Sequence, residues 1–274
     1  MRWRGERESG NIEDRRGMPG GGLAVGGIGG LIIAAIVYFL GGDANQVIQQ
    51  PADQVQTTAD PNDTIRHFIG VVLASTEDAW TSIFNQMHKQ YTDPTLVLFT
   101  GQTDAGCGLA SAASGPFYCP ADQKVYIDLS FFDELTNRFG ASGGDFAMAY
   151  VLAHEVGHHV QHLLGLTDQV DEQRQNLSQS GYNKLSVKLE LQADFLAGVW
   201  AHYNQKNLES GDIEEAMSAA SAVGDDRLQK QSQGYVVPDA FTHGTSEQRM
   251  YWFKKGYATG DISQGDTFHD PSLN

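Results

Sequence analysis

Residues 151–162 read VLAHEVGHHVQH, and within this stretch the pattern H-E-x-x-H runs from His154 to His158. On an α-helix, residues four positions apart lie on one face, so the two imidazoles can bind one Zn²⁺ ion. Glu155 is rotated by about 100° from His154 around the helix, which directs it to water at the metal rather than to the metal. The stretch therefore predicts a helix with two zinc ligands and a general base. Two surface histidines on an amphipathic helix are the alternative interpretation.

Residues 189–194, LELQAD, contain a second pair of polar residues at helical spacing, Glu190 and Asp194. Both point from one face of a helix. We expect Glu190 to be the third zinc ligand and Asp194 to accept the free ring N–H of a zinc histidine, which fixes the tautomer of that ring. The flanking residues are apolar, and acids in so apolar a helix need a buried partner. A half-exposed helix with an acidic face is the alternative.

The residues that follow the H-E-x-x-H pattern narrow the class of site. The metzincin pattern requires Gly at position 161 and His at position 164, where this chain has Gln161 and Leu164. That class is therefore excluded. His158 and His162 also lie four positions apart, but the residue directly after His158 is not a glutamate. His159 and His162 are therefore interpreted as surface or structural residues.

The composition is that of a globular protein with an acidic surface. The chain has 274 residues, of which 41% are hydrophobic and 19% charged, enough for one sizeable domain and a tail. The formal net charge is −16. An acidic body repels phosphate backbones, which argues against nucleic-acid binding. The acidity is interpreted as a solvated surface that favours solubility, and a preference for basic substrates is the alternative.

The N-terminal part of the sequence predicts a membrane anchor. Residues 1–17 form a charged head, and no charged residue occurs in residues 18–42, which are long enough to cross a hydrocarbon core of about 30 Å. Five arginines precede this segment, so the positive-inside rule places the N-terminus in the cytoplasm. A flexible linker, residues 43–62, then leads to a domain at residues 63–274 outside the cytoplasm. A cleaved signal peptide and a buried core helix are the alternatives.

Hydrophobic periodicity and capping residues predict a mainly helical α+β domain with a small sheet. Asp145 is a plausible N-cap, Gly165 a plausible C-terminal stop, and Thr245 with Gln248 has capping-box spacing. The predicted helices are Thr64–Met87, Phe146–Leu164, Leu185–Asn204, Glu214–Val223 and Thr245–Gly256, and the predicted strands are Thr95–Thr100 and Lys124–Leu129.

The only cysteines are Cys107 and Cys119, which flank a stretch rich in Gly and Ser. They lack the C-x-x-C spacing of zinc knuckles. A disulfide, half of a metal site and two buried thiols all remain open. If the domain lies outside the cytosol, a disulfide is favoured.

Several long stretches resemble one bacterial family, the neutral zinc metallopeptidases of the gluzincin group. The resemblance covers nearly the whole chain and implies a zincin-like fold, one Zn²⁺ ion and a peptide or protein substrate. It rests on RWRGERESGNIEDRRG (residues 2–17), GPFYCPADQKVYIDLSFF (115–132), VLAHEVGHHVQHLLG (151–165), LELQAD (189–194) and FTHGTSEQR (241–249).

The last of these stretches is similar to a T-H-P-x-x-x-x-R element of related membrane-linked zinc peptidases. The resemblance implies that His243 and Arg249 lie near the zinc and stabilise the transition state, although Gly244 stands where the element has Pro. Many family members carry a Cys after the Asp of LELQAD and another near the C-terminus, where this chain has Phe195 and Gly265. Phe195 is therefore expected to pack near residues 260–268.

Together these observations predict a membrane-anchored zinc peptidase that hydrolyses peptide bonds with a metal-bound water. Glu155 is the general base, and the sheet to which Val125–Leu129 belongs could provide an edge for backbone pairing with substrate. The predicted location is the bacterial cell membrane, with a single span and the domain on the periplasmic side. A zinc-stabilised envelope domain that only binds a partner and an amidase acting on cell-wall peptides are the alternative functions.

Overall fold

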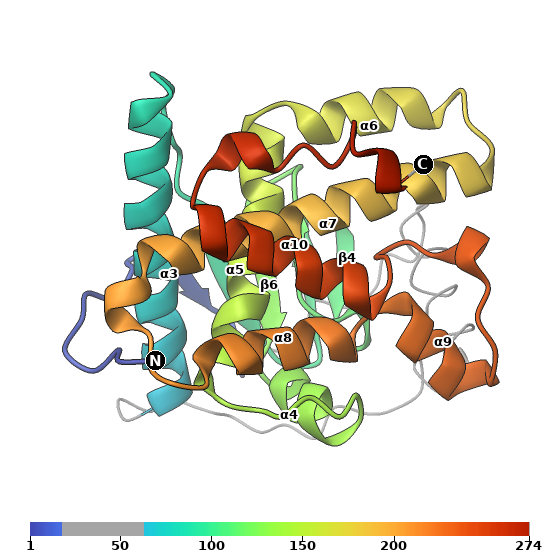
Figure 1. Cartoon of the computed structure of the whole chain (residues 1–274). Helices are drawn as coiled ribbons and strands as arrows, with labels where there is room; N and C mark the ends of the chain where they lie inside the picture. The colour runs from blue at the N-terminus through green and yellow to red at the C-terminus, as the bar shows by residue number, and fades with distance from the viewer. Residues whose placement is uncertain (18–62, 274) are drawn as a thin grey trace.

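The computed structural model describes residues 1–17 and 63–273 (Figure 1). The predicted membrane anchor at residues 18–42 and the predicted linker at residues 43–62 lie outside the described residues. Within the described part of the chain, no helix combines the length and the apolar character needed to cross a membrane.

Eight α-helices make up most of the described chain. The four long ones are α3 (Thr64–Gln86), α5 (Asp145–Leu163), α7 (Gln179–Tyr203) and α10 (Ser246–Thr259). The shorter ones are α4 (Ser130–Asn137), α6 (Leu166–Arg174), α8 (Asp212–Ala222) and α9 (Asp225–Gln233).

A small mixed sheet has the strand order β1-β2-β6-β5, and a separate hairpin joins β3 to β4. In the sheet, β1, β2 and β6 run parallel, whereas β5 pairs antiparallel with β6. The sheet strands are β1 (Ile12–Asp14), β2 (Thr95–Phe99), β6 (Lys124–Asp128) and β5 (Phe117–Cys119), and the hairpin strands are β3 (Gln102–Ala105) and β4 (Gly108–Ser111).

Helix α5 lies in the centre of the molecule, with α7 and α10 across one side and the sheet behind it (Figure 1). It is buried along nearly its whole length because neighbours cover it from several directions, including α3 and α8. The aromatic side chains of Trp80, Phe146, Trp200 and Phe253 are fully buried in the surrounding core. A helix so enclosed holds its side chains in fixed directions, which suits a precise binding site.

Helices α7 and α10 pack with their backbones unusually close. A Cβ atom added at Gly198 of α7 would lie 2.1 Å from the carbonyl oxygen of Phe253, and one at Gly256 of α10 would lie 2.0 Å from that of Phe195. No side chain larger than hydrogen fits at either contact without moving a helix. The two glycines thus set the position of α10 relative to α7.

The predicted architecture is confirmed as mainly helical α+β with a small sheet. The capping box of Thr245 and Gln248 is present, and Gly165 follows α5 with a left-handed φ of 76°. Helix α5 begins one residue earlier than predicted, because Gly144 rather than Asp145 is its N-cap. In the sheet that contains Val125–Leu129, β6 has β2 on one side and β5 on the other, so among the described strands the edge next to β6 is β5.

Residues 1–17 differ most from the sequence prediction, which made them a separate head before a domain that starts at residue 63. They lie on that domain instead. Ile12–Asp14 pairs with β2, and the ring of Trp3 packs edge-on against Phe68 of α3, with 5.6 Å between the ring centres. The fold therefore includes both described parts of the chain.

Candidate metal centre

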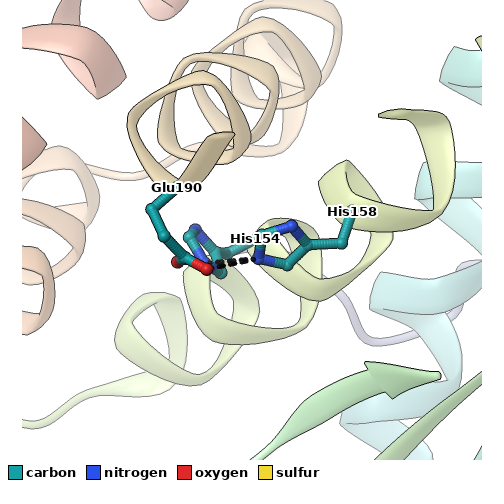
Figure 2. A group of neighbouring side chains, drawn as sticks. All are labelled: His154, His158 and Glu190. Carbon is teal, nitrogen blue, oxygen red and sulfur yellow. Dashed lines mark hydrogen bonds and ion pairs between the residues drawn. The ribbon is translucent and has the colours of Figure 1, made fainter. Parts of the chain in front are cut away.

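Three side chains converge between α5 and α7: His154, His158 and Glu190 (Figure 2). The Nε2 atoms of the two histidines are 3.2 Å apart, and the carboxylate of Glu190 lies 3.2 Å from Nε2 of His154 and 3.4 Å from Nε2 of His158. In a tetrahedral zinc site with bonds of about 2.0–2.1 Å, neighbouring ligand atoms are about 3.3 Å apart. Oε2 of Glu190 is the oxygen near His154 and Oε1 is the oxygen near His158, and each of these distances is that of neighbouring ligand atoms in such a site.

Gly157 allows the two helices to approach closely enough for this arrangement. A Cβ atom at Gly157 would lie 3.0 Å from the carbonyl oxygen of Ala193 on α7. A larger residue would push α7 away from α5 and separate Glu190 from the histidines. Gly157 thus admits the backbone of α7 next to the metal ligands.

Asp194 determines which ring nitrogen of His154 faces the centre. Its Oδ1 lies 2.9 Å from Nδ1 of His154, and Arg249 donates to both carboxylate oxygens at 2.8 and 2.9 Å. Tyr150 donates a further hydrogen bond to Oδ1. Burial alone would raise the pKa of Asp194, but Arg249 and His154 lower it to about 2. An ionised Asp194 accepts the Nδ1 proton of His154, so the Nε2 lone pair points at Glu190 and His158.

Gln161 determines which ring nitrogen of His158 faces the centre. Its amide nitrogen donates to the carbonyl oxygen of Leu189 at 2.7 Å, so its oxygen is the atom that faces Nδ1 of His158 at 2.9 Å. The oxygen can only accept, which places the proton of His158 on Nδ1. Sequence reasoning did not assign this role, although the i,i+3 spacing from His158 was a signal for it.

The residues present fit a zinc ion. Two imidazole lone pairs and one carboxylate face a single point. These electron-rich groups repel one another unless a positive charge lies between them. Burial alone would lower the pKa of His154, but Asp194 and Glu190 raise it to about 10. The same negative surroundings favour a divalent cation, and the nitrogen and oxygen donors are those that zinc takes in open, three-residue sites.

Glu155 lies on α5 directly after the first ligand and is 8% exposed. Among the described residues, none forms a hydrogen bond or ion pair with its carboxylate. Its charge acts on His158, since Glu155 is one of the groups that raise the pKa of that histidine against the lowering effect of burial. The carboxylate is thus close to the centre without being engaged elsewhere.

Arg249 lies near the centre, as the resemblance implied, on the Nδ1 side of His154. Its guanidinium is 4% exposed and lies behind His154, where it binds Asp194 and reaches the hydroxyl of Tyr150 at 3.3 Å and the carbonyl oxygen of Val223 at 3.4 Å. Every one of these contacts is directed to a group that supports His154 or to the backbone. The geometry indicates a residue that positions a ligand.

His243 lies in the turn before α10, beside Glu190. A Cβ atom at the neighbouring Gly244 would be 3.2 Å from Leu191 and 3.3 Å from Val187, so the turn packs on α7 around the position of Glu190. Burial alone would lower the pKa of His243, but its hydrogen bond to Asp225 and the charge of Glu190 raise it. The ring remains 44% exposed, so it can meet a substrate.

Asp225, at the start of α9, holds this turn and was not predicted from the sequence. Its Oδ2 accepts the backbone N–H groups of Thr242, His243 and Gly244 at 2.7, 2.6 and 3.1 Å, while Oδ1 lies 3.3 Å from Nδ1 of His243. Gly244 has a φ of 89°, which proline cannot adopt. The turn therefore has a different backbone from one with Pro at this position.

Cys107 and Cys119 form a disulfide, which decides between the alternatives left open by the sequence. The bond ties the β3–β4 turn to the end of β5. His159 is buried, with Nε2 2.6 Å from the carbonyl oxygen of Thr92 and Nδ1 3.0 Å from the hydroxyl of Tyr118. Burial lowers the pKa of His159 to about 4. Its predicted structural role is confirmed.

The expected position of Phe195 is also confirmed. A Cβ atom at Gly265 would lie 2.5 Å from the ring of Phe195, so the aromatic ring fills the space where a side chain at position 265 would point.

These features define a candidate zinc centre of the H-E-x-x-H class, with its third ligand on a second helix. The chain belongs to the family described as "Putative neutral zinc metallopeptidase", whose profile matches residues 1–268. It is similar to the Escherichia coli K12 protein named "Uncharacterized protein YpfJ", with 52% identity over 98% of this chain and 99% of the relative. An uncharacterized protein of Mycobacterium tuberculosis H37Rv is 42% identical over 86% of each chain. No solved structure gave a significant match.

Proposed function

We propose that the protein is a zinc-dependent peptidase, with His154, His158 and Glu190 holding one Zn²⁺ ion. The observation that carries the proposal is the convergence of three side chains beside an unengaged Glu155: the two Nε2 atoms are 3.2 Å apart, and oxygens of Glu190 lie 3.2 Å from one and 3.4 Å from the other. A bound Zn²⁺ ion supplies a Lewis acid that acidifies water and polarises the carbonyl group of a peptide bond. The family description supports the same class of enzyme.

Glu155 acts as the general base and then as the general acid. It takes a proton from the attacking water and delivers it to the amine that leaves. A carboxylate fully bound to a neighbouring arginine would be a weaker base, because the positive charge would lower its pKa. Among the described residues, no arginine binds the carboxylate of Glu155, which suits this residue to the role of general base.

His243 donates a hydrogen bond to the oxyanion that develops on the substrate. Asp225 and the hydroxyl of Thr242 engage its Nδ1 at 3.3 and 2.9 Å, which leaves Nε2 for the substrate. A well-placed donor of this kind is worth about 2.7–4 kcal/mol in the transition state. Arg249 contributes indirectly, because it keeps Asp194 ionised and in place behind His154.

The peptide or protein substrate is aligned by the edge strand β5. This strand contacts α5 directly, and Tyr118 of β5 packs against the rings of His159 and His162. A peptide that adds to β5 by backbone pairing would therefore run alongside the helix that carries the metal ligands. This placement assigns the substrate edge of the predicted sheet to β5, the neighbour of β6.

Two alternatives use the same centre. A zinc-stabilised domain that only binds a partner would need neither Glu155 nor an open coordination position, so the arrangement favours catalysis. An amidase acting on cell-wall peptides would use the same chemistry and differs only in substrate. Both alternatives can be separated from a general peptidase by the products that the protein releases.

The test is cleavage of a broad mixture of unfolded peptides by the zinc-loaded full chain, followed by mass spectrometry. Wild type is compared with Glu155→Gln and with Glu172→Gln, a matched change of an exposed glutamate on α6. We expect wild type and Glu172→Gln to release the same products and Glu155→Gln to release none while retaining zinc. Activity that survives in Glu155→Gln, or none in wild type with one zinc bound, would overturn the proposal.

A further inference from the structure

Residues 1–17 are joined to the rest of the fold by backbone hydrogen bonds at several points. Ile12 and Asp14 of β1 are in register with Leu96 and Leu98 of β2. Beyond the strand, the amide of Ser9 donates to the carbonyl oxygen of Gly70 on α3 at 3.0 Å. Bonds of this kind require the two segments to be in direct contact.

The side chains of this segment also complete the interior of the domain. Glu77 of α3 is buried, with 7% of its side chain exposed. Its carboxylate accepts hydrogen bonds from Arg7, Ser9 and Asn11, and all three donors belong to residues 1–17. Without the segment this buried charge would lose the partners that the structure shows, which is a costly state. The segment is therefore part of the folded domain.

The two described parts of the chain meet where they border residues 18–62. Arg16 donates one hydrogen bond to the carboxylate of Asp63 and another to that of Asp14. Asp63 is also the N-cap of α3, accepting from the backbone N–H of Arg66 at 3.0 Å. The chain thus leaves the described structure and returns to it at one place.

From these contacts we infer that residues 1–17 and 63–273 lie in the same compartment as one folded unit. A single membrane crossing between residues 17 and 63 would put β1 and β2 on opposite sides of a hydrocarbon core about 30 Å thick. Strands so separated could not share hydrogen bonds. The inference departs from the predicted topology, with a cytoplasmic N-terminus and an external domain, and it is independent of the proposed peptidase activity.

The arginines that suggested a cytoplasmic N-terminus have partners in this unit. Arg7 binds Glu77 and Asp78, Arg15 binds Glu13, and Arg16 binds Asp14 and Asp63. Three of the five arginines before residue 18 are thereby accounted for by the fold itself. Their presence needs no explanation from membrane orientation.

The first test locates both parts of the full chain in intact cells. Single cysteines replace exposed residues, Glu6→Cys in the N-terminal segment and Lys254→Cys on α10, and a membrane-impermeant maleimide is added. Wild type, whose cysteines form a disulfide, is the unlabelled control. We expect both positions to be labelled or both to be protected, with full labelling after the cells are opened. Labelling of one and protection of the other in intact cells would overturn the inference.

The second test detects the contact itself without changing the chain. Lys124 of β6 lies with its Nζ 2.6 Å from the carboxylate of Glu13 in β1, within reach of a zero-length carbodiimide cross-link. We expect mass spectrometry of the full chain, cross-linked in its native membranes or extract, to show this link within single chains. Lys124→Arg keeps the charge but cannot form the amide, so it is the matched control. No link, or a link found only between two chains, would contradict the inference.

Discussion

The metal-bearing helices and the contact of the N-terminal segment with α3 both enclose a buried carboxylate, but only the first could be recognised from the sequence. Asp194 in α7 is buried behind a metal ligand, and Glu77 in α3 is buried beneath the N-terminal segment; each has partners far along the chain. Asp194 is held by Arg249, 55 residues away, and Glu77 by Ser9, 68 residues away. Asp194 was recognisable because Glu190 lies four residues before it, at helical spacing. Glu77 was not, because nothing in residues 1–17 shows such a repeat.

The largest effect is expected at the ligands. His154→Ala removes one of the three zinc ligands, so the protein should retain little zinc. Its rate of peptide cleavage should fall by at least a thousandfold, the scale on which catalytic groups act. The N-terminal segment should stay in place, which cross-linking of Glu13 to Lys124 would show. Zinc content by mass spectrometry is the readout. The matched control, His269→Ala, alters an exposed histidine near the C-terminus and should change nothing.

The next effect is expected from Arg249→Met, which leaves the buried charge of Asp194 without its main partner. Loss of one member of a buried pair costs about 3–5 kcal/mol of unfolding free energy. Urea denaturation would measure it, with Arg174→Met on the exposed face of α6 as the control. The double variant Arg249→Met, Asp194→Asn should be less destabilised than the sum of the single changes. Strict additivity would show that the two side chains do not interact.

A smaller effect is expected from Gln161→Leu, which removes the acceptor for Nδ1 of His158 while keeping the side chain's size. Changes of this kind lower metal affinity by about 10–100-fold. Competition with a chromophoric chelator would measure the zinc dissociation constant. Gln179→Leu, at the start of α7 and exposed, is the control. An unchanged affinity would mean that Gln161 does not orient the ligand.

The smallest effect is expected from Ser9→Ala in the N-terminal segment, which removes one of three donors to Glu77. An incompletely satisfied buried acceptor costs about 1–3 kcal/mol. Thermal unfolding of the full chain should show the loss, whereas peptide cleavage at low temperature should be unchanged. A Ser9→Ala protein as stable as wild type would indicate that the segment is not docked.

Local patterns predicted the long helices, the H-E-x-x-H ligands and the pair Glu190 and Asp194, because each depends on spacing within one helix. The disulfide was one of the alternatives that the cysteines allowed. Residues whose role depends on distant partners were missed or misread. Strand β1 has only three residues, and its partner β2 begins at Thr95. The segment is therefore too short for an alternation of apolar and polar residues to predict a strand. Asp225 supports His243 across a loop, and Arg249 reaches Asp194 because α10 packs closely on α7.

The most direct test of the account is X-ray absorption at the zinc edge of the full chain, with and without a small mercaptoacyl amino acid. The account predicts one zinc per chain bound by imidazole nitrogen and oxygen, and a new sulfur neighbour at about 2.3 Å when the thiol is added. That change would show a coordination position open to substrate beside His154, His158 and Glu190. A protein that binds no zinc, or a spectrum that the thiol leaves unchanged, would contradict the account.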